Sequence, residues 1–517
     1  MSTYITRFVY KISSILSFLI FGILLYFAFT ETGKINYDMV EYNYFVKDNL
    51  CLNLLLLVLF IYSIHKISNY LCKYRIKHLM IFFMICITIL LVYLIDHVNL
   101  TPSWDSAKTI QAAVGLINHD YSMFTYGNYI SQYPFQVPLV LYYAFFIKIF
   151  GENYIILQFI NIIFLLCTYF FIIKISFLIS HHKKIAIMTL LLLVTFIPLQ
   201  MYVMFLYSNI PSLFCMTTGI YFFLNHYQNH EYKNIILSFV FLGLATLFKG
   251  TAYIVVIAVI IMYILELLHK FNLKKIAIIV ISTLILVITP TQINKAVSSL
   301  NPSISLSSTA YKEIALVMGT SYGPRGAGWH NGWYEPKLYK MYGNDVQAMK
   351  KDGQKRTINN LKELYTNHKL LSFYHDKICS MYINPDYQGF WTIVANKTQQ
   401  FGQGDSNKQS FLFIKYDPST DQYSHFTSSF MTGKINQGII AYENVLMNAI
   451  YLGCICFIYF NQKTMTKEKI FIPIIFIGCF LFFLAWEAKA QYSILFYILL
   501  FPIAAEGINH LISHFNI

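Results

Sequence analysis

The chain is dominated by long apolar runs that are separated by short polar connections. Most runs are about 20 residues long, which is the length that an α-helix needs to cross the hydrocarbon core of a membrane. They lack the alternation of apolar and polar residues that marks a membrane β-strand. Hydrophobic residues make up 57% of the chain and charged residues only 12%. The sequence therefore predicts an all-α polytopic membrane protein with about twelve transmembrane helices.

The connections between the runs indicate how the helices are oriented. The predicted spans are residues 8–30, 50–66, 78–96, 153–178, 185–203, 206–226, 233–248, 251–268, 275–292, 436–460, 470–486 and 491–511. Loops that stay in the cytoplasm carry an excess of lysine and arginine. The basic loops at 73–77, 181–184, 269–275 and 463–469 all satisfy this rule if both termini are inside. The first run is too long for a signal-peptide core, so we predict that it is a retained span.

Two stretches between spans are predicted to lie outside the cytoplasm. Residues 97–152 include the apolar run 135–149, which is too short to cross and predicts an interfacial or re-entrant helix. Residues 293–435 are polar and rich in turns, and they predict a small external mixed domain. The chain then divides into an N-terminal membrane module at 1–292, this external domain, and C-terminal membrane helices at 436–517.

Charge and cysteine usage exclude some classes of protein. The net charge of +14 is spread over the short loops, and no nucleic-acid-binding module accompanies it. Of the nine cysteines, only Cys379 lies in the external domain, so no disulfide can form within that domain. The predicted spans carry almost no charge at mid-bilayer, where a secondary transporter keeps its substrate site. This distribution favours a site at the outer interface.

Asp105 is the first candidate residue, because a carboxylate kept at a membrane surface is a functional candidate. It begins an amphipathic stretch that follows the third predicted span. Asp at such a position commonly caps a helix, and Ser103 or Asp105 would serve that role here. The functional interpretation is a general base that takes a proton from an acceptor hydroxyl. Spacing alone leaves both interpretations open.

Three further charged residues lie at the predicted outer ends of spans. Glu487 and Lys489 form a tight turn between the last two spans, which predicts either an interfacial ion pair or a site for a charged headgroup. Lys249 lies in the turn between the seventh and eighth spans. It is either a solvated loop lysine or a phosphate ligand of the point-charge kind.

The glycine-rich run 319–334 in the external domain combines Arg325 and His330 with Trp329. It is not a P-loop, because no Gly-Lys-Ser/Thr sequence and no strand–helix context accompany it. A flexible loop is one interpretation. Aromatic faces together with one arginine and one histidine also suit a sugar ring or a phosphate.

Several of these segments together resemble the GT-C superfamily of membrane glycosyltransferases, which use polyprenyl-phosphate sugars. They are Trp104-Asp105, Gln132-Tyr133-Pro134, Phe150-Gly151-Glu152-Asn153 and the run from Trp486-Glu487 to Tyr492. Protein O-mannosyltransferases and lipid A aminoarabinose transferases are relatives within that superfamily. The similarity extends over most of the chain and is clearest in the first external loop and the span that follows it.

The resemblance implies a role for each matching residue. Asp105 would activate the acceptor hydroxyl, and the sugar would be transferred with inversion while polyprenyl phosphate leaves. Basic residues would stabilise the leaving phosphate, with Lys249, Lys489 and Arg325 as candidates in that order. The residues expected to line the site are Trp104, Tyr133, Glu487, Tyr492, Trp329 and His330.

The chain departs from the superfamily pattern at some positions. Gln491 stands where bacterial members usually have arginine, which shifts the expected phosphate-binding role to Lys489. Asp120 and Glu152 are the candidates for a second acidic residue of the first loop. Some relatives use a divalent metal, but the sequence shows no ligand cluster that demands one and no certain cofactor.

The sequence thus predicts a glycosyltransferase of the cell membrane whose active site faces away from the cytoplasm. Its donor would be a polyprenyl-phosphate sugar, and its acceptor a cell-wall or teichoic-type polymer, a lipid-linked glycan or a protein. Two alternatives stay open, namely a lipid-linked glycan polymerase or ligase of another fold, and a transporter or flippase of lipid-linked sugars.

Overall fold

The computed structural model describes residues 2–36, 41–98, 100, 102, 104–306, 309–343, 345–394 and 425–515. These residues are mostly helical, and their only strands form two antiparallel hairpins of two strands each. This confirms the predicted all-α class. Ser103, which the sequence offered as a helix cap, and residues 395–424 of the predicted external domain lie outside the described residues.

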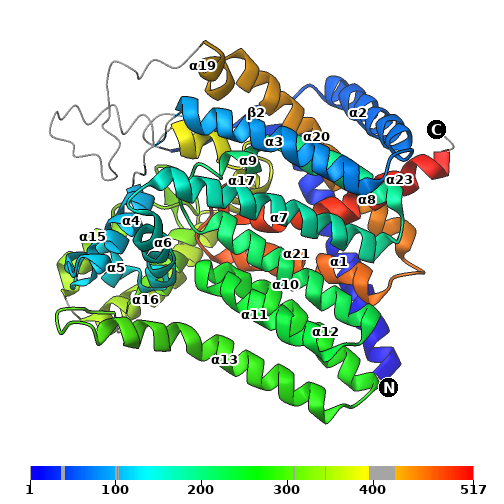
Figure 1. Cartoon of the computed structure of the whole chain (residues 1–517). Coiled ribbons are helices and arrows are strands. Elements are labelled where there is room, and N and C mark those ends of the chain that lie inside the picture. The colour runs from blue at the N-terminus through cyan, green and yellow to red at the C-terminus, as the bar shows by residue number, and fades with distance from the viewer. Residues whose placement is uncertain are drawn as a thin grey trace.

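Nine helices in the described part of the chain are long and apolar enough to cross a membrane. The chain is therefore a multi-pass membrane protein (Figure 1). These spans are α1 (Ser2–Thr30), α2 (Leu50–Leu71), α3 (Ile76–Val98), α7 (Tyr154–Ser180), α12 (Tyr253–His269), α13 (Leu273–Ser298), α20 (Lys434–Asn461), α21 (Lys467–Ala485), and α22 with α23 (Ala490–Tyr497 and Phe501–Phe515).

The other three predicted spans are helical but are shorter, broken or more polar. The span predicted at 185–203 is divided into α8 (Lys183–Thr195) and α9 (Ile197–Met201), because Pro198 cannot continue a helix. The span predicted at 206–226 is α10 (Asn209–Asn229), whose core-facing side carries hydroxyl and amide groups. The span predicted at 233–248 is α11 (Tyr232–Phe248), which has 17 residues.

The break between α8 and α9 reveals a charged residue that the sequence did not single out. Glu443 of α20 is buried, and its Oε1 accepts a hydrogen bond from the backbone N–H of Ile197 at 2.9 Å. The carboxylate thus satisfies a donor that the interrupted helix leaves free. The expectation that the spans carry almost no buried charge is corrected at this position.

The basic loops meet at one end of the bundle. Lys183 at the start of α8 donates to the carbonyl of Cys72 at the end of α2, at 2.7 Å. At the N-terminus, the hydroxyl of Thr6 lies 2.7 Å from the ring of His269, the last residue of α12. Both termini lie at this same end, and α4, α6, α15 and α16 lie at the opposite end (Figure 1).

The first predicted external loop folds into a small helical layer at that opposite end. It contains α4 (Trp104–Ile117), η1 (Ser122–Phe124), α5 (Tyr129–Gln132), η2 (Pro134–Gln136) and α6 (Val137–Phe150). The segments before and after Pro134 are bent by 104°, the geometry of a broken span or a re-entrant loop. Because α4 packs on α6 through a shared apolar cluster, Asp105 is held close to the bundle.

The remaining elements of this end come from two distant parts of the chain. The first hairpin pairs β1 (Glu31–Ile35) with β2 (Asn43–Lys47), directly after α1. The others are α14 (Tyr311–Gly319), β3 (Tyr322–Gly323), β4 (Gly326–Ala327), α15 (Tyr334–Tyr342), α16 (Val346–Thr366), α17 (Leu370–Tyr382) and α19 (His425–Met431). Helix α17 packs against α1, α21 and α22, so this part of the chain is joined to the membrane helices.

A close backbone contact joins the glycine-rich run to the last external turn. A Cβ atom at Gly319 would lie 2.3 Å from the carbonyl oxygen of Ala485, so only glycine fits there. The buried ammonium of Lys377 donates to the carbonyls of Gly319, Leu484 and Trp486, the last two at 2.9 Å. This contact fixes the turn that carries Glu487 and Lys489.

Candidate active site

Asp105 lies in the first turn of α4, next to the buried Ser106 and Thr109. The hydroxyl of Tyr129 donates a hydrogen bond to its carboxylate. The side chain is accessible to solvent, although many protein atoms surround it. Burial raises the pKa of Asp105 above its ordinary value, and the positive charges of Lys489 and Lys108 offset only part of this effect.

Glu41, in the loop of the first hairpin, holds two cations that the sequence analysis predicted for the site. Its Oε1 lies 2.9 Å from Nζ of Lys489 and 3.0 Å from Nη1 of Arg325. Its Oε2 accepts a hydrogen bond from Nε2 of Gln388 at 3.0 Å. Burial alone would raise the pKa of Glu41, but Lys489 and then Arg325 bring that pKa below its usual range. Glu41 is therefore ionised and fixes both cations.

Glu487 and Lys489 face the same cluster. Burial raises the pKa of Glu487 to about 7; Lys489 opposes the shift, whereas Glu41, Glu335 and Asp105 add to it. For Lys489, burial would lower the pKa, but Glu41 and Glu487 raise it above its ordinary value. Lys489 is therefore charged at neutral pH, and acidic groups surround it.

Lys249 has a different environment, because its partners are uncharged. Its Nζ donates to Oδ1 of Asn209 at 2.6 Å and lies 5.0 Å from the centroid of the Tyr492 ring. Burial, together with the positive charge of Lys489, lowers the pKa of Lys249 to about 7. A half-buried lysine with only neutral partners retains a preference for an anion.

Lys249 and Tyr492 line a cavity of about 490 Å³. Its walls are mostly apolar and aromatic, and they include Phe135, Tyr207, Phe248, Tyr311, Phe482 and Trp486. Pro290 and Asn294 of α13 also line it, and α13 is largely exposed on the outside of the bundle. The cavity therefore extends from Lys249 towards a helix whose surface is available to lipid.

Tyrosines connect this cavity to Asp105. Tyr207 and Tyr311 line the cavity, and the negative charge of Asp105 acts on both hydroxyl groups. Tyr207 also shares a hydrogen bond with Tyr129, the donor to Asp105. Asp105 and Glu487 do not themselves line the cavity.

Other predicted residues take different positions. Tyr133 donates a hydrogen bond to Glu335, a residue of α15 that the sequence analysis missed. His330 lies near Lys489, Arg325 and Glu41; burial and these two cations lower its pKa to about 4, so it is neutral at pH 7.

Neither predicted tryptophan is shown to contribute to the cavity wall. Trp329 is fully buried, and its indole N–H donates to Oγ of Ser380 at 2.9 Å, so the structure gives it a packing role instead of a site-lining one. Trp104 is 43% exposed and is not part of the wall of the cavity that contains Lys249.

The acidic residues around Asp105 are not those that the sequence suggested. Asp120 is exposed and accepts a hydrogen bond from the backbone N–H of Ser122. Three other acidic residues interact electrostatically with Asp105 instead. They are Glu41, Glu335 and Glu487. Glu41 had one usable signal, since it is a carboxylate that follows the first span closely, as Asp105 follows the third. The sequence offered no signal for Glu335 other than the aromatic residues next to it.

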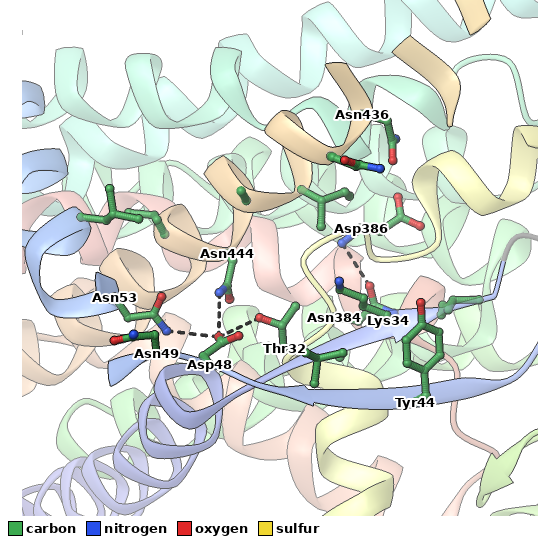
Figure 2. Close-up of a pocket in the computed structure, with 18 of the residues that line it drawn as sticks. Thr32, Lys34, Tyr44, Asp48, Asn49, Asn53, Asn384, Asp386, Asn436 and Asn444 are labelled. Carbon is green, nitrogen blue, oxygen red and sulfur yellow. Dashed lines mark hydrogen bonds between the residues drawn. The ribbon is translucent and has the colours of Figure 1, made fainter. Parts of the chain in front are cut away.

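A second cavity, of about 480 Å³, lies between the first hairpin, the start of α2 and the start of α20 (Figure 2). Figure 2 shows Thr32, Asn53 and Asn444 converging on one carboxylate oxygen of Asp48, at 2.8, 3.1 and 3.0 Å. Asn384 and Asn436 also line this cavity, and each has a buried side-chain nitrogen without a hydrogen-bond partner in the described part of the chain. Amides rather than charged pairs dominate its wall.

Residues 136–293, from the start of α6 to within α13, match the family of dolichyl-phosphate-mannose-protein mannosyltransferases, which belongs to the GT-C superfamily. The match confirms the resemblance to that superfamily and indicates a mannosyltransferase-like glycosyltransferase of the GT-C type. No curated protein and no solved structure matches the chain. Lys249 lies within the matched segment, and Asp105 lies before it.

Proposed function

We propose that the protein transfers a sugar from a polyprenyl-phosphate donor to a hydroxyl acceptor at the outer face of the cell membrane, with both termini in the cytoplasm. The observation that carries this proposal is the cavity that joins a largely exposed helix, α13, to the half-buried Lys249, next to the tyrosines around Asp105. An isoprenoid chain is apolar and its phosphate is anionic. Such a ligand suits an aromatic cavity that contains one lysine.

In this proposal Asp105 is the general base. A carboxylate whose pKa is raised above its ordinary value holds a proton more readily than a free aspartate, and this favours removal of a proton from an attacking hydroxyl. The acceptor would approach from the side of Asp105 and the phosphate would leave on the side of Lys249. Attack from the side opposite the leaving group inverts the anomeric carbon.

Lys249 would neutralise the charge that develops on the leaving phosphate. It suits this role better than Lys489 or Arg325, because those two cations already share an ion pair with Glu41. They would instead set the field around Asp105. The acceptor class is a cell-wall or teichoic-type polymer, a lipid-linked glycan or a protein.

The test compares Asp105→Asn with Asp120→Asn, a change of the same type in the same loop at an exposed position. Both variants would be reconstituted with polyprenyl-phosphate-linked radiolabelled mannose and native membranes as acceptor. Asp105→Asn should reduce transfer by about 10²–10⁴-fold, the usual contribution of a general base. Asp120→Asn should transfer at the wild-type rate. Turnover retained by Asp105→Asn at equal expression would show that Asp105 is not the base.

A further inference from the structure

Glu31, His375 and Cys379 place three potential metal-ligand atoms within 4.8 Å of one another. His375 and Cys379 are four residues apart on α17, so both side chains lie on one face of that helix. Glu31 begins β1, more than 340 positions earlier in the chain. The cluster is separate from the groups around Asp105. We propose that it is a binding site for a divalent transition metal of the zinc type.

Two of the three distances between the ligand atoms are close to those around a tetrahedral ion, and all three lie within 4.8 Å. Zinc binds sulfur at about 2.3 Å and nitrogen at about 2.0–2.1 Å, so the sulfur–nitrogen edge of a zinc tetrahedron is about 3.6 Å. In the structure Sγ of Cys379 lies 3.6 Å from Nε2 of His375. Oε2 of Glu31 lies 3.9 Å from the same nitrogen, against about 3.4 Å for the corresponding edge of that tetrahedron. A shift of about half an ångström in the half-buried carboxylate of Glu31 closes this difference.

The surroundings of His375 support the same assignment. Its Nδ1 lies 3.0 Å from Oδ1 of Asp376. A proton held on Nδ1 by this carboxylate leaves the lone pair of Nε2 directed at Cys379 and Glu31. A carboxylate behind a ligating histidine is the usual arrangement at protein zinc sites. The ring of Phe27 also packs edge-on against His375 at 4.8 Å and restricts its orientation.

Cys379, His375 and Asp376 also have the composition of a nucleophilic triad, but the environment opposes that role. Cys379 is fully buried, and burial with the negative charges of Glu31 and Asp376 raises the pKa of its thiol. A reactive cysteine needs access and a lowered pKa. A bound dication reverses the effect of those charges, because the thiol releases its proton to solvent and the thiolate and carboxylate neutralise the metal. Thiolate and imidazole ligands favour zinc over calcium or magnesium.

A metal at this position would attach the first hairpin to α17. Glu31 is the first residue of β1, and the hairpin that β1 forms with β2 carries Glu41 in its loop. The backbone N–H of Gly33 already donates to the carbonyl of Ile383 at 3.0 Å on the same side. The metal would therefore hold the hairpin that positions Glu41, although the binding test below does not depend on any activity.

The experiment uses the full chain in detergent, stripped with a chelator and titrated with Zn²⁺ or Co²⁺. The wild type should bind one Zn²⁺ per chain with a rise in thermal stability, and Co²⁺ should give a thiolate charge-transfer band. Cys379→Ser should lose the band, whereas Cys456→Ser, at another buried cysteine, should keep it. Absence of binding in the wild type, or an unchanged band in Cys379→Ser, would overturn the proposal.

Asp376→Asn keeps the proposal testable if Cys379→Ser fails to fold, because Asp376 is partly exposed. Loss of the carboxylate behind His375 should weaken Zn²⁺ binding by about 10–100-fold without changing the stoichiometry. An unchanged affinity would contradict the assignment. Alkylation of Cys379 by iodoacetamide in the folded protein, at the same rate with and without Zn²⁺, would show an accessible nucleophile and overturn it as well.

Discussion

The cluster around Asp105 and the cavity around Asp48 both use buried polar groups, but they stabilise them in different ways. In the first, the carboxylate of Glu41 pairs with both Lys489 and Arg325, so charges stabilise one another. In the second, three neutral donors hold one oxygen of Asp48. A buried charge that loses its partner costs several kcal/mol, whereas a lost hydrogen bond costs about 1 kcal/mol. The first region is therefore the more sensitive to substitution.

The largest effect is expected for Glu41→Gln. The change leaves Lys489 and Arg325 without their shared counter-ion, and breaking a buried pair in this way costs about 3–5 kcal/mol. Thermal or denaturant unfolding in detergent would measure the loss of stability. Glu363→Gln, at an exposed position of α16, is the control and should unfold as the wild type does. Equal stability of the two variants would remove the distinction between the two regions.

An intermediate effect is expected for Lys249→Met. The pKa of Lys249 is lowered to about 7, so in the free enzyme the ammonium is charged below that pH and is lost as the pH rises through it. Under the proposed function, the KM for the donor should therefore increase above about pH 7 in the wild type.

The variant should show a raised KM below about pH 7, a KM close to that of the wild type above it, and no increase near pH 7. A hydrogen bond to a charged group is worth about 1.5–3 kcal/mol, or roughly tenfold or more in affinity. Lys148→Met, at an exposed lysine of α6, is the matched control. A pH step that persists in Lys249→Met would assign the titration to another group.

The smallest effect is expected for Thr32→Val in the second cavity. The substitution removes one of the three donors to Asp48 and preserves the shape of the side chain. The two asparagine donors stay in place, so the expected loss is about 1 kcal/mol. Thr88→Val is the control, because the hydroxyl of Thr88 bonds only to a carbonyl of its own helix in the described structure. A loss as large as that of Glu41→Gln would show that the two regions are equally sensitive.

Local sequence was sufficient for the helical class and for much of the topology. Apolar runs and basic loops predicted helices at the right places, and loops far apart in the chain, at Cys72 and Lys183, do meet. The division of the span at 185–203 was not predicted. Pro198 indicated a possible break, because proline interrupts a helix. The break also depends on Glu443, a partner about 245 positions away.

The candidate site was predictable only where a residue is of an unusual type for its position in the local sequence. Four charged residues stood out because they lie beside span ends: Asp105, Lys249, Glu487 and Lys489. In the structure, the charges of Asp105, Glu487 and Lys489 do act on one another. Trp329 was chosen for its residue type and is instead a core residue. Whether a tryptophan faces a cavity or the core depends on contacts from other helices.

The sequence by itself determined that the chain crosses a membrane repeatedly and keeps acidic and basic residues at the helix ends, because apolar length and loop charge are local properties. Only the tertiary structure decided which charges become partners. Glu41 meets Arg325 across more than 280 positions of sequence, and Glu31 meets His375 across more than 340. Such meetings depend on how the helices pack, and no pattern along the chain specifies that packing.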